Sequence, residues 1–179
     1  MSADDPHLST YYHEVSTDLP PCGLYRTAKA IGSIEAGRLV YFHNHGDPGP
    51  GVYLPEAWNG NRARFQANGT VLPEKFDYKS LHALPPEGFY RVKKTFHCCE
   101  KQCMKFEPDA FVQLGYNGTG KALMFIPELG STSIAIPERG TFVDDDVLDN
   151  LQLLKIAERK GGDEPGGIDI KLPRGIVIH

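Results

Sequence analysis

The sequence predicts an all-β protein made of two small, similar β-barrels packed together, with only minor helical turns. Three observations favour this fold class. The chain repeats its own sequence in ordered blocks, its apolar segments are short and rich in β-branched and aromatic residues, and turn-forming residues separate them, with 19 Gly and 14 Pro among 179 residues. A composition of 40% hydrophobic and 23% charged residues is typical of a globular chain.

The internal repeat is clearest at the start of each copy. Residues 19–26 (LPPCGLYR) return as residues 84–91 (LPPEGFYR), with six of eight positions identical, at an offset of 65. Two further blocks follow in the same order: 39–42 and 52–56 match 111–114 and 124–128 at an offset of 72, and 69–70 match 140–141 at 71. Because the order is preserved, we interpret the pattern as a tandem duplication rather than a recurrence of common turn and strand sequences.

The repeat divides the chain into four parts. These are an N-terminal arm (1–18), a first β-barrel repeat (19–84), a second repeat (85–156), and a C-terminal linker and strand (157–179). The offset grows from 65 to 72, so the second repeat holds 72 − 65 = 7 extra residues, which we assign to an insertion at 97–103. Residues 168–172 alternate between apolar and polar, as a half-buried strand does, and could pack on their own barrel or on a neighbour's sheet edge.

Five short strands are expected in each repeat. In the first they fall at residues 24–28, 38–43, 52–54, 63–65 and 71–72, and in the second at 89–92, 110–114, 122–126, 133–136 and 142–143. The Gly-rich stretches 44–51 and 116–121 are expected to be hairpin loops. Five short strands in about 65 residues resemble an SH3-like barrel at the level of topology.

Each repeat is expected to end in a helical turn. Acidic residues open the segment 144–154, where they favour a helix N-terminus, and Val147, Leu148, Leu151 and Leu154 would share one helical face. Phe76, Leu81 and Leu84 are expected to do the same in the first repeat. A barrel of about 60 residues has a small core, so an apolar contact between the two barrels is also expected. Within that core we expect three matched buried pairs: Tyr25 and Tyr90, Val40 and Val112, and Leu54 and Ile126.

Charge and composition argue against several classes of partner. The net charge of −4 argues against a general nucleic-acid or membrane-surface binder, and no apolar run approaches the roughly 18 residues of a membrane helix. The polar, acidic start MSADDPHLST lacks the pattern of a secretory signal. Four cysteines are too few for a disulfide scaffold, so we expect free thiols and a cytoplasmic location.

A first candidate for metal chemistry is His43-x-His45-x-Asp47. Two histidines at i and i+2 of a strand face the same side and can share a metal. The pattern resembles that of metallo-β-lactamase-type hydrolases, although Pro48 stands where that family has another histidine. The equivalent positions of the second repeat are Gly115, Asn117 and Thr119, so the fold itself does not require ligands here, and an exposed hairpin loop is the alternative.

The insertion 97–103 (HCCEKQC) is the second candidate. Thiolate and imidazole suit zinc, and His97, Cys99 and Cys103 lie within ligand spacing. Cys98 is expected to point away from Cys99, and a fourth ligand would come from Cys22 or a distant histidine. A redox pair and free thiols packed as small apolar groups are the alternatives, and free thiols are the leading interpretation.

No cofactor other than zinc is indicated, and the sequence favours a binding protein over an enzyme. It has neither a nucleophile elbow nor a phosphate-binding loop. Trp58 stands where the second repeat has Gly130, so the common fold does not demand it, and we expect it in a surface loop. An alternative is that Trp58 fills the contact between the barrels.

We therefore predict a non-enzymatic adaptor that binds a protein partner through Trp58, His43, His45 and Asp47. Nucleic acid and membranes are not expected partners. The alternative functions are a small metal-dependent hydrolase using the His43-x-His45-x-Asp47 loop, and a zinc-binding regulator using the 97–103 cluster.

Overall fold

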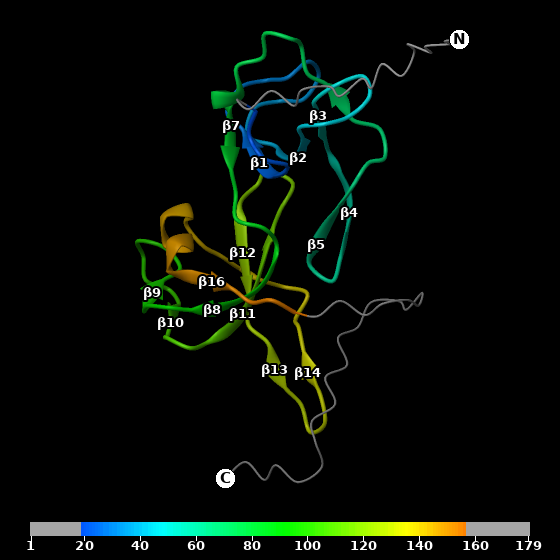
Figure 1. Ribbon diagram of the computed structural model, residues 1–179. Coiled ribbons are helices and arrows are strands. Elements are labelled where there is room, and N and C mark those ends of the chain that lie inside the picture. Colours follow the sequence, from blue (N-terminus) through cyan, green and yellow to red (C-terminus); the bar gives the residue numbers. More distant parts are fainter. Residues whose placement is uncertain (1–18, 157–179) are drawn as a thin grey trace, which may run out of the picture.

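The computed structural model describes residues 19–156, which form two five-stranded antiparallel sheets with small accessory hairpins (Figure 1). The first sheet has the order β6-β3-β2-β1-β7. Its strands are β1 (Gly23–Thr27), β2 (Leu39–His43), β3 (Gly51–Tyr53), β6 (Thr70–Val71) and β7 (Leu81–Ala83). A separate hairpin of β4 (Pro55–Asn59) and β5 (Arg62–Phe65) follows β3, and the short 3-10 helix η1 (Tyr78–Ser80) precedes β7.

The second sheet has the order β15-β12-β11-β8-β16. Its strands are β8 (Gly88–Val92), β11 (Phe111–Tyr116), β12 (Ala122–Phe125), β15 (Thr141–Phe142) and β16 (Leu151–Leu153). Two hairpins accompany it, β9 (Phe96–His97) with β10 (Lys105–Phe106), and β13 (Glu128–Leu129) with β14 (Ile134–Ala135). The 3-10 helix η2 (Asp145–Asn150) precedes β16. Each half thus runs through its strands, an outlying hairpin and a 3-10 turn in the same order.

Strand registers in the two sheets follow the sequence offsets. Tyr25 pairs with Val40 as Tyr90 pairs with Val112, and Val52 pairs with Thr70 as Met124 pairs with Thr141. No ladder joins the edge strands of either sheet in residues 19–156, so neither sheet closes into a barrel there.

In each half, the loop between the first two long strands is closed by a bridge between two apolar residues. In the first half, an isolated bridge pairs Ile31 with Ile34. The β9–β10 hairpin pairs Phe96 with Phe106, at positions offset by 65 and 72 from those isoleucines. All four side chains are buried. A buried apolar pair therefore closes the loop in both halves, and the segment 97–103 lies in the longer loop of the second half.

Two buried clusters form the core, one in each half. The first includes Tyr25, Val40 and Phe42, and the second includes Tyr90, Val112 and Tyr116, to which Leu39 of β2 also contributes. Of the expected buried pairs, Tyr25 with Tyr90 and Val40 with Val112 are buried. The pair of Leu54 and Ile126 is wrong: Leu54 is half-buried and Ile126 is 43% exposed. Both lie beyond the ends of β3 and β12, where the chain leaves the sheet.

The expected helical turns are shorter than predicted, and each is followed by a strand. η2 ends at Asn150, the N–H of the following Leu151 donates to Leu148 O, and β16 then pairs with β8. In the first half η1 gives way to β7, which pairs with β1. Leu148 and Leu151 are both buried. One 3-10 turn followed by a strand therefore places in the core two residues whose spacing suggests a helix. The expected strand at 168–172 lies outside the described residues.

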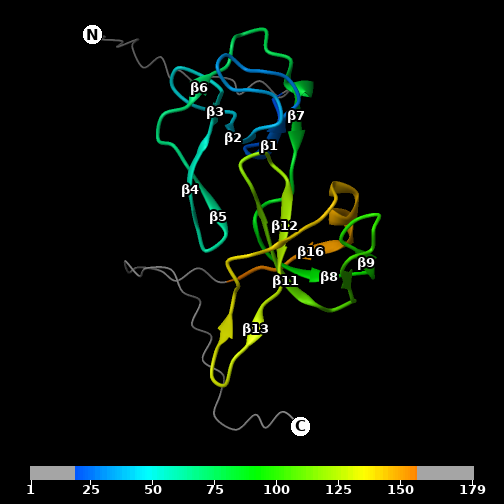
Figure 2. The same ribbon diagram turned by 180° about the vertical axis from the view of Figure 1, so that it is seen from behind.

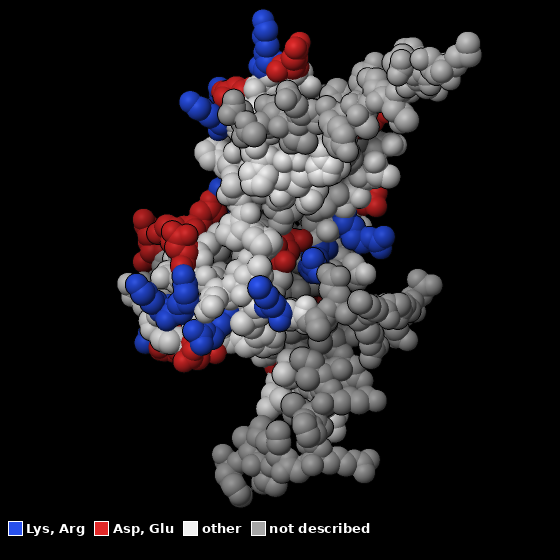
Figure 3. Space-filling model, viewed as in Figure 1, with Lys and Arg blue, Asp and Glu red and all other residues white. Residues whose placement is uncertain are grey.

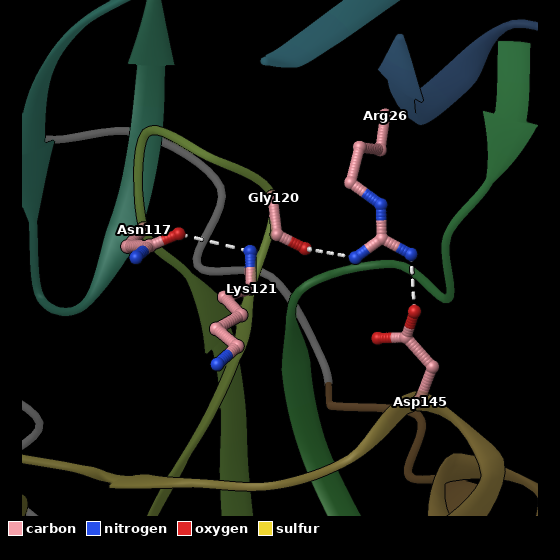
Figure 4. Close-up of polar contacts among 5 residues, drawn as sticks. All are labelled: Arg26, Asn117, Gly120, Lys121 and Asp145. Carbon is pink, nitrogen blue, oxygen red and sulfur yellow. Dashed lines mark hydrogen bonds and ion pairs between the residues drawn. The ribbon is translucent and has the colours of Figure 1, made fainter. Parts of the chain in front are cut away.

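Direct contacts hold the two halves together, since Leu24 and Leu39 of the first half pack into the core cluster of the second. The β11–β12 loop lies beside β1 (Figure 2). Arg26 of β1 donates to Gly120 O at 3.4 Å and forms an ion pair with Asp145 of η2 (Figure 4). The β11–β12 loop that presents Gly120 is itself fixed, because Asn117 Oδ1 accepts from Lys121 N at 2.9 Å. Leu39 N also donates to Gly118 O at 3.0 Å.

Acidic side chains gather around η2 on one face of the molecule, with basic side chains beside them (Figure 3). Asp145, which pairs with Arg26, belongs to this acidic group. The helices in the described part of the chain are two 3-10 turns, and neither is a candidate for spanning a membrane.

Candidate functional site

The β4–β5 hairpin extends from the first half toward the second (Figures 1 and 2). Side-chain hydrogen bonds fix its tip there. Asn61 Nδ2 donates to Gln113 Oε1 at 3.1 Å and lies 2.9 Å from Pro137 O. In return, Gln113 Nε2 donates to Gly60 O at 2.7 Å. Gln113 is buried, so these bonds satisfy a side chain that would otherwise be costly to bury.

The hairpin approaches β11 so closely that only glycine fits at position 115. A Cβ on Gly115 would lie 2.4 Å from Asn61 O. Glu87 also holds the hairpin against β11, because its carboxylate accepts from Ala63 N of β5 at 2.9 Å and from Tyr116 N at 3.3 Å. Burial raises the pKa of Glu87, and the two N–H donors offset only part of that shift. The hairpin is thus held in position by side chains and backbone groups of the second half.

A hollow of about 300 Å³ opens at this junction. Its walls come from both halves: Trp58, Asn61, Tyr116, Asn117, Gly118, Leu123, Phe125 and Glu138. Trp58 Nε1 donates to Tyr116 O at 2.7 Å, yet the residue stays 45% exposed. A fixed aromatic ring beside an open, mostly apolar hollow can receive an apolar side chain of a partner.

The expectation that Trp58 lies in a surface loop is wrong, because it lies in strand β4, opposite Ala63 of β5. Its indole bonds to the second half, and the residue remains 45% exposed. The β4 strand gave no signal of its own in the sequence, since PEAWN has no alternation between apolar and polar residues.

His43 and His45 belong to a different site from Trp58. His43 ends β2 and lies against Tyr53, with ring centroids 6.4 Å apart. The two imidazoles are close to each other, with 3.2 Å between their Nε2 atoms, and Cys22 Sγ lies 3.6 Å from His45 Nδ1. Donor atoms of all three side chains lie within 4.8 Å of one another, and Asp47 is not part of this group.

Asn44 links the members of this Cys–His group. Its Oδ1 lies 3.0 Å from Cys22 Sγ and 2.8 Å from His45 Nδ1, and its Nδ2 donates to Pro20 O at 3.0 Å. The backbone N–H of Asn44 also donates to Cys22 Sγ at 3.2 Å. The sequence motif pointed to the two histidines, but their contact with Cys22 comes only from the pairing of β1 with β2.

The thiols of the insertion form a second group, at Cys98, Cys99 and Cys103. Cys99 Sγ lies 3.5 Å from Cys98 Sγ and 4.0 Å from Cys103 Sγ. The expectation that Cys98 points away from Cys99 is wrong, because both residues lie in a bend after β9 and not in a strand. His97, which was expected to join Cys99 and Cys103, is not in this group.

Hydrogen bonds make the three thiols unequal. The Cys98 thiol and the backbone N–H groups of Cys103 and Lys101 lower the pKa of Cys99. The hydrogen bond and the charge of Cys99 in turn raise the pKa of Cys103. Cys98 is buried and accepts from Met104 N at 3.3 Å. Of Cys99 and Cys103, Cys99 therefore forms a thiolate more readily.

Comparison with protein-family models, with curated proteins and with solved structures gave no match to this chain.

Proposed function

We propose that this protein is a non-enzymatic adaptor that holds an extended segment of a partner protein in the hollow beside Trp58. The observation that carries the proposal is that one hydrogen bond fixes the Trp58 indole while the residue remains 45% exposed. A large aromatic side chain held in one orientation loses little entropy when a partner covers it, which is the common property of binding hot spots.

The shape and chemistry of the hollow indicate the kind of segment it would take. A volume of about 300 Å³ is at the small end for ligand sites and suits one or two side chains better than a cofactor. Leu123 and Phe125 provide apolar walls, and Glu138 is the one charged residue of the lining. The partner segment should therefore carry an apolar side chain next to a lysine or arginine.

We also propose that the two halves are copies of one SH3-like unit. Both sheets have the same strand order, with a 3-10 turn before the last strand, and their registers follow the sequence offsets. In both copies a tyrosine of the first strand donates to a proline carbonyl four residues earlier, Tyr25 to Pro21 at 2.8 Å and Tyr90 to Pro86 at 2.6 Å. In such a duplicated protein, the binding site would lie where the hairpin of one unit meets the sheet of the next.

A selection from a displayed library of random linear peptides tests the binding function. Trp58 is the only tryptophan of the chain, so its fluorescence reports directly on the hollow during titration with a selected peptide. We expect enriched peptides to combine an aromatic or aliphatic residue with a basic neighbour and to change the Trp58 emission. Trp58→Ala should weaken binding about 30-fold or more, which corresponds to about 2 kcal/mol.

Two further variants distinguish specific binding in the hollow from non-specific binding elsewhere on the surface. Leu153 is 47% exposed on the edge strand β16 and provides a matched control, so Leu153→Ala should leave the affinity unchanged. Glu138→Gln should weaken binding several-fold and reduce its salt dependence. If no peptide is enriched, or if binding is equally strong in Trp58→Ala, the proposed function is wrong.

A further inference from the structure

We propose that Cys22, His43 and His45 form a binding site for a divalent transition-metal ion of the zinc class. The site lies where the turn before β1 meets the end of β2 and the loop that follows. It is separate from the Trp58 hollow and does not depend on the proposed adaptor function. One thiolate and two imidazoles are the donors that zinc prefers, whereas Mg²⁺ and Ca²⁺ require oxygen ligands.

The spacing of the donor atoms suits a single ion. Zinc bonds of about 2.3 Å to sulfur and about 2.0 Å to nitrogen place neighbouring ligand atoms about 3.3–3.6 Å apart in a tetrahedron. The two Nε2 atoms of His43 and His45 are 3.2 Å apart, and donor atoms of all three residues lie within 4.8 Å of one another. Small rotations of side chains near the surface would bring the three atoms onto one ion.

Asn44 prepares His45 for this role. Its amide is oriented by donation from Nδ2 to Pro20 O, so its Oδ1 faces His45 Nδ1 as an acceptor. His45 Nδ1 must then carry the proton, and its Nε2 is left with a lone pair directed at His43. A histidine ligand held through its other nitrogen is the usual arrangement around bound metals. The same bond argues against a Cys22–His45 catalytic pair, because the nitrogen nearest the thiol is already protonated.

Comparison of the two halves indicates that the fold does not demand these side chains. Glu87 occupies the position of Cys22 and accepts the N–H of Tyr116, just as Cys22 accepts the N–H of Asn44. An acceptor is therefore needed at this position, but sulfur is not. Gly115 and Asn117 stand where the first half has His43 and His45.

The protein would supply three ligands and leave one coordination position for water or another donor. Cys22 and His43 are half-buried and His45 is exposed, so an ion could enter from solvent without any opening of the fold. Three ligands with an accessible fourth position are typical of zinc sites that bind an external molecule, whereas structural sites are closed by four.

Metal titration of the full chain, purified without a histidine tag and stripped with a chelator, tests the site. Because the thiols of the insertion would also bind metal, the test uses the variant Cys99→Ser/Cys103→Ser, in which Cys22 and buried Cys98 keep their thiols. We expect one equivalent of Co²⁺ with the visible and near-ultraviolet bands of tetrahedral thiolate coordination, displaced by one equivalent of Zn²⁺. Zn²⁺ should also raise the melting temperature.

Substitutions then assign the ligands. In the same background, Cys22→Ser keeps an acceptor for Asn44 N but should abolish the thiolate-to-cobalt band. His43→Gln and His45→Gln should each weaken Zn²⁺ binding about 100-fold and remove the melting shift, whereas His82→Gln, at an exposed histidine of β7, should change neither. Failure to bind one equivalent of metal, or binding that survives loss of Cys22 and His43, would overturn the site.

Discussion

The indole nitrogen of Trp58 donates a 2.7 Å hydrogen bond to the carbonyl oxygen of Tyr116, joining the hairpin of the first half to the central strand of the second. Trp58→Phe keeps an aromatic ring at this position but removes the donor. We expect it to lower the free energy of unfolding by about 1 kcal/mol, the usual net value of one hydrogen bond. Urea denaturation followed by circular dichroism measures this; unchanged stability would mean that water replaces the bond without loss.

Two glycines near the tip of the β4–β5 hairpin differ in the room that they leave for a side chain. Gly115→Ala would place a Cβ 2.4 Å from Asn61 O, so the hairpin must move, and we expect a loss of about 1–3 kcal/mol. Gly118→Ala is the matched control, because its Cβ would meet only the Trp58 ring at 3.7 Å. Equal stability of the two variants in denaturant titrations would show that the hairpin is not held against β11.

The two matched tyrosines give a second paired test. Tyr25→Phe and Tyr90→Phe each remove one hydroxyl bonded to a proline carbonyl, and each should cost about 1 kcal/mol in denaturant unfolding. A large difference between the two costs would mean that the tyrosines do not have the same role in both halves.

Burial of Tyr90 should also make the free energy of unfolding depend on pH in the alkaline range. Burial raises the pKa of Tyr90 to about 12, from 10.0 in an unfolded chain. Because the folded state holds the proton more tightly, this stabilisation is complete below pH 10 and is lost as the pH rises through about 12. Tyr90→Phe should flatten that part of the stability curve, and a curve as steep as that of the wild type would contradict the prediction.

Glu87 should contribute a pH dependence in the acid range. Burial raises its pKa above the ordinary value of 4.5, so the stabilisation linked to its proton is complete below pH 4.5 and is lost as the pH rises through the higher folded pKa. Glu87→Gln does not titrate. The stability of the wild type relative to this variant should therefore decline as the pH rises from 4.5, and thermal unfolding across this range measures the difference. A relative stability that rises instead would mean that the N–H donors outweigh burial.

Much of the strand layout could be predicted from the sequence, because similar sequence blocks in the two halves could be compared with each other. The LPPxG(L/F)YR blocks mark β1 and β8, and β-branched residues around Val40 and Val112 mark the buried strands beside them. The last strands, β7 and β16, were missed because Leu81 and Leu151 fit a helical spacing, and only the tertiary pairing with β1 and β8 decides between helix and strand.

The candidate sites were harder to predict, because each depends on residues brought together by long-range pairing. Trp58 stood out as the odd residue of the repeat, but nothing local placed it over Tyr116, 58 positions away. His43 and His45 form a visible motif, whereas their neighbour Cys22 lies more than 20 positions earlier and meets them only across the β1–β2 ladder. Asp47 belongs to the sequence motif but is not part of the group formed by Cys22, His43 and His45.

The contact between the β4–β5 hairpin and the second sheet makes the two halves unequal. The second half receives a hairpin because Gly115 leaves room for Asn61, whereas the first half has His43 at the corresponding position of β2. A β13–β14 hairpin docked on the first sheet in the same way would meet a side chain at His43, where the second sheet has none at Gly115. The position that admits the hairpin tip is thus present in the second half and filled in the first.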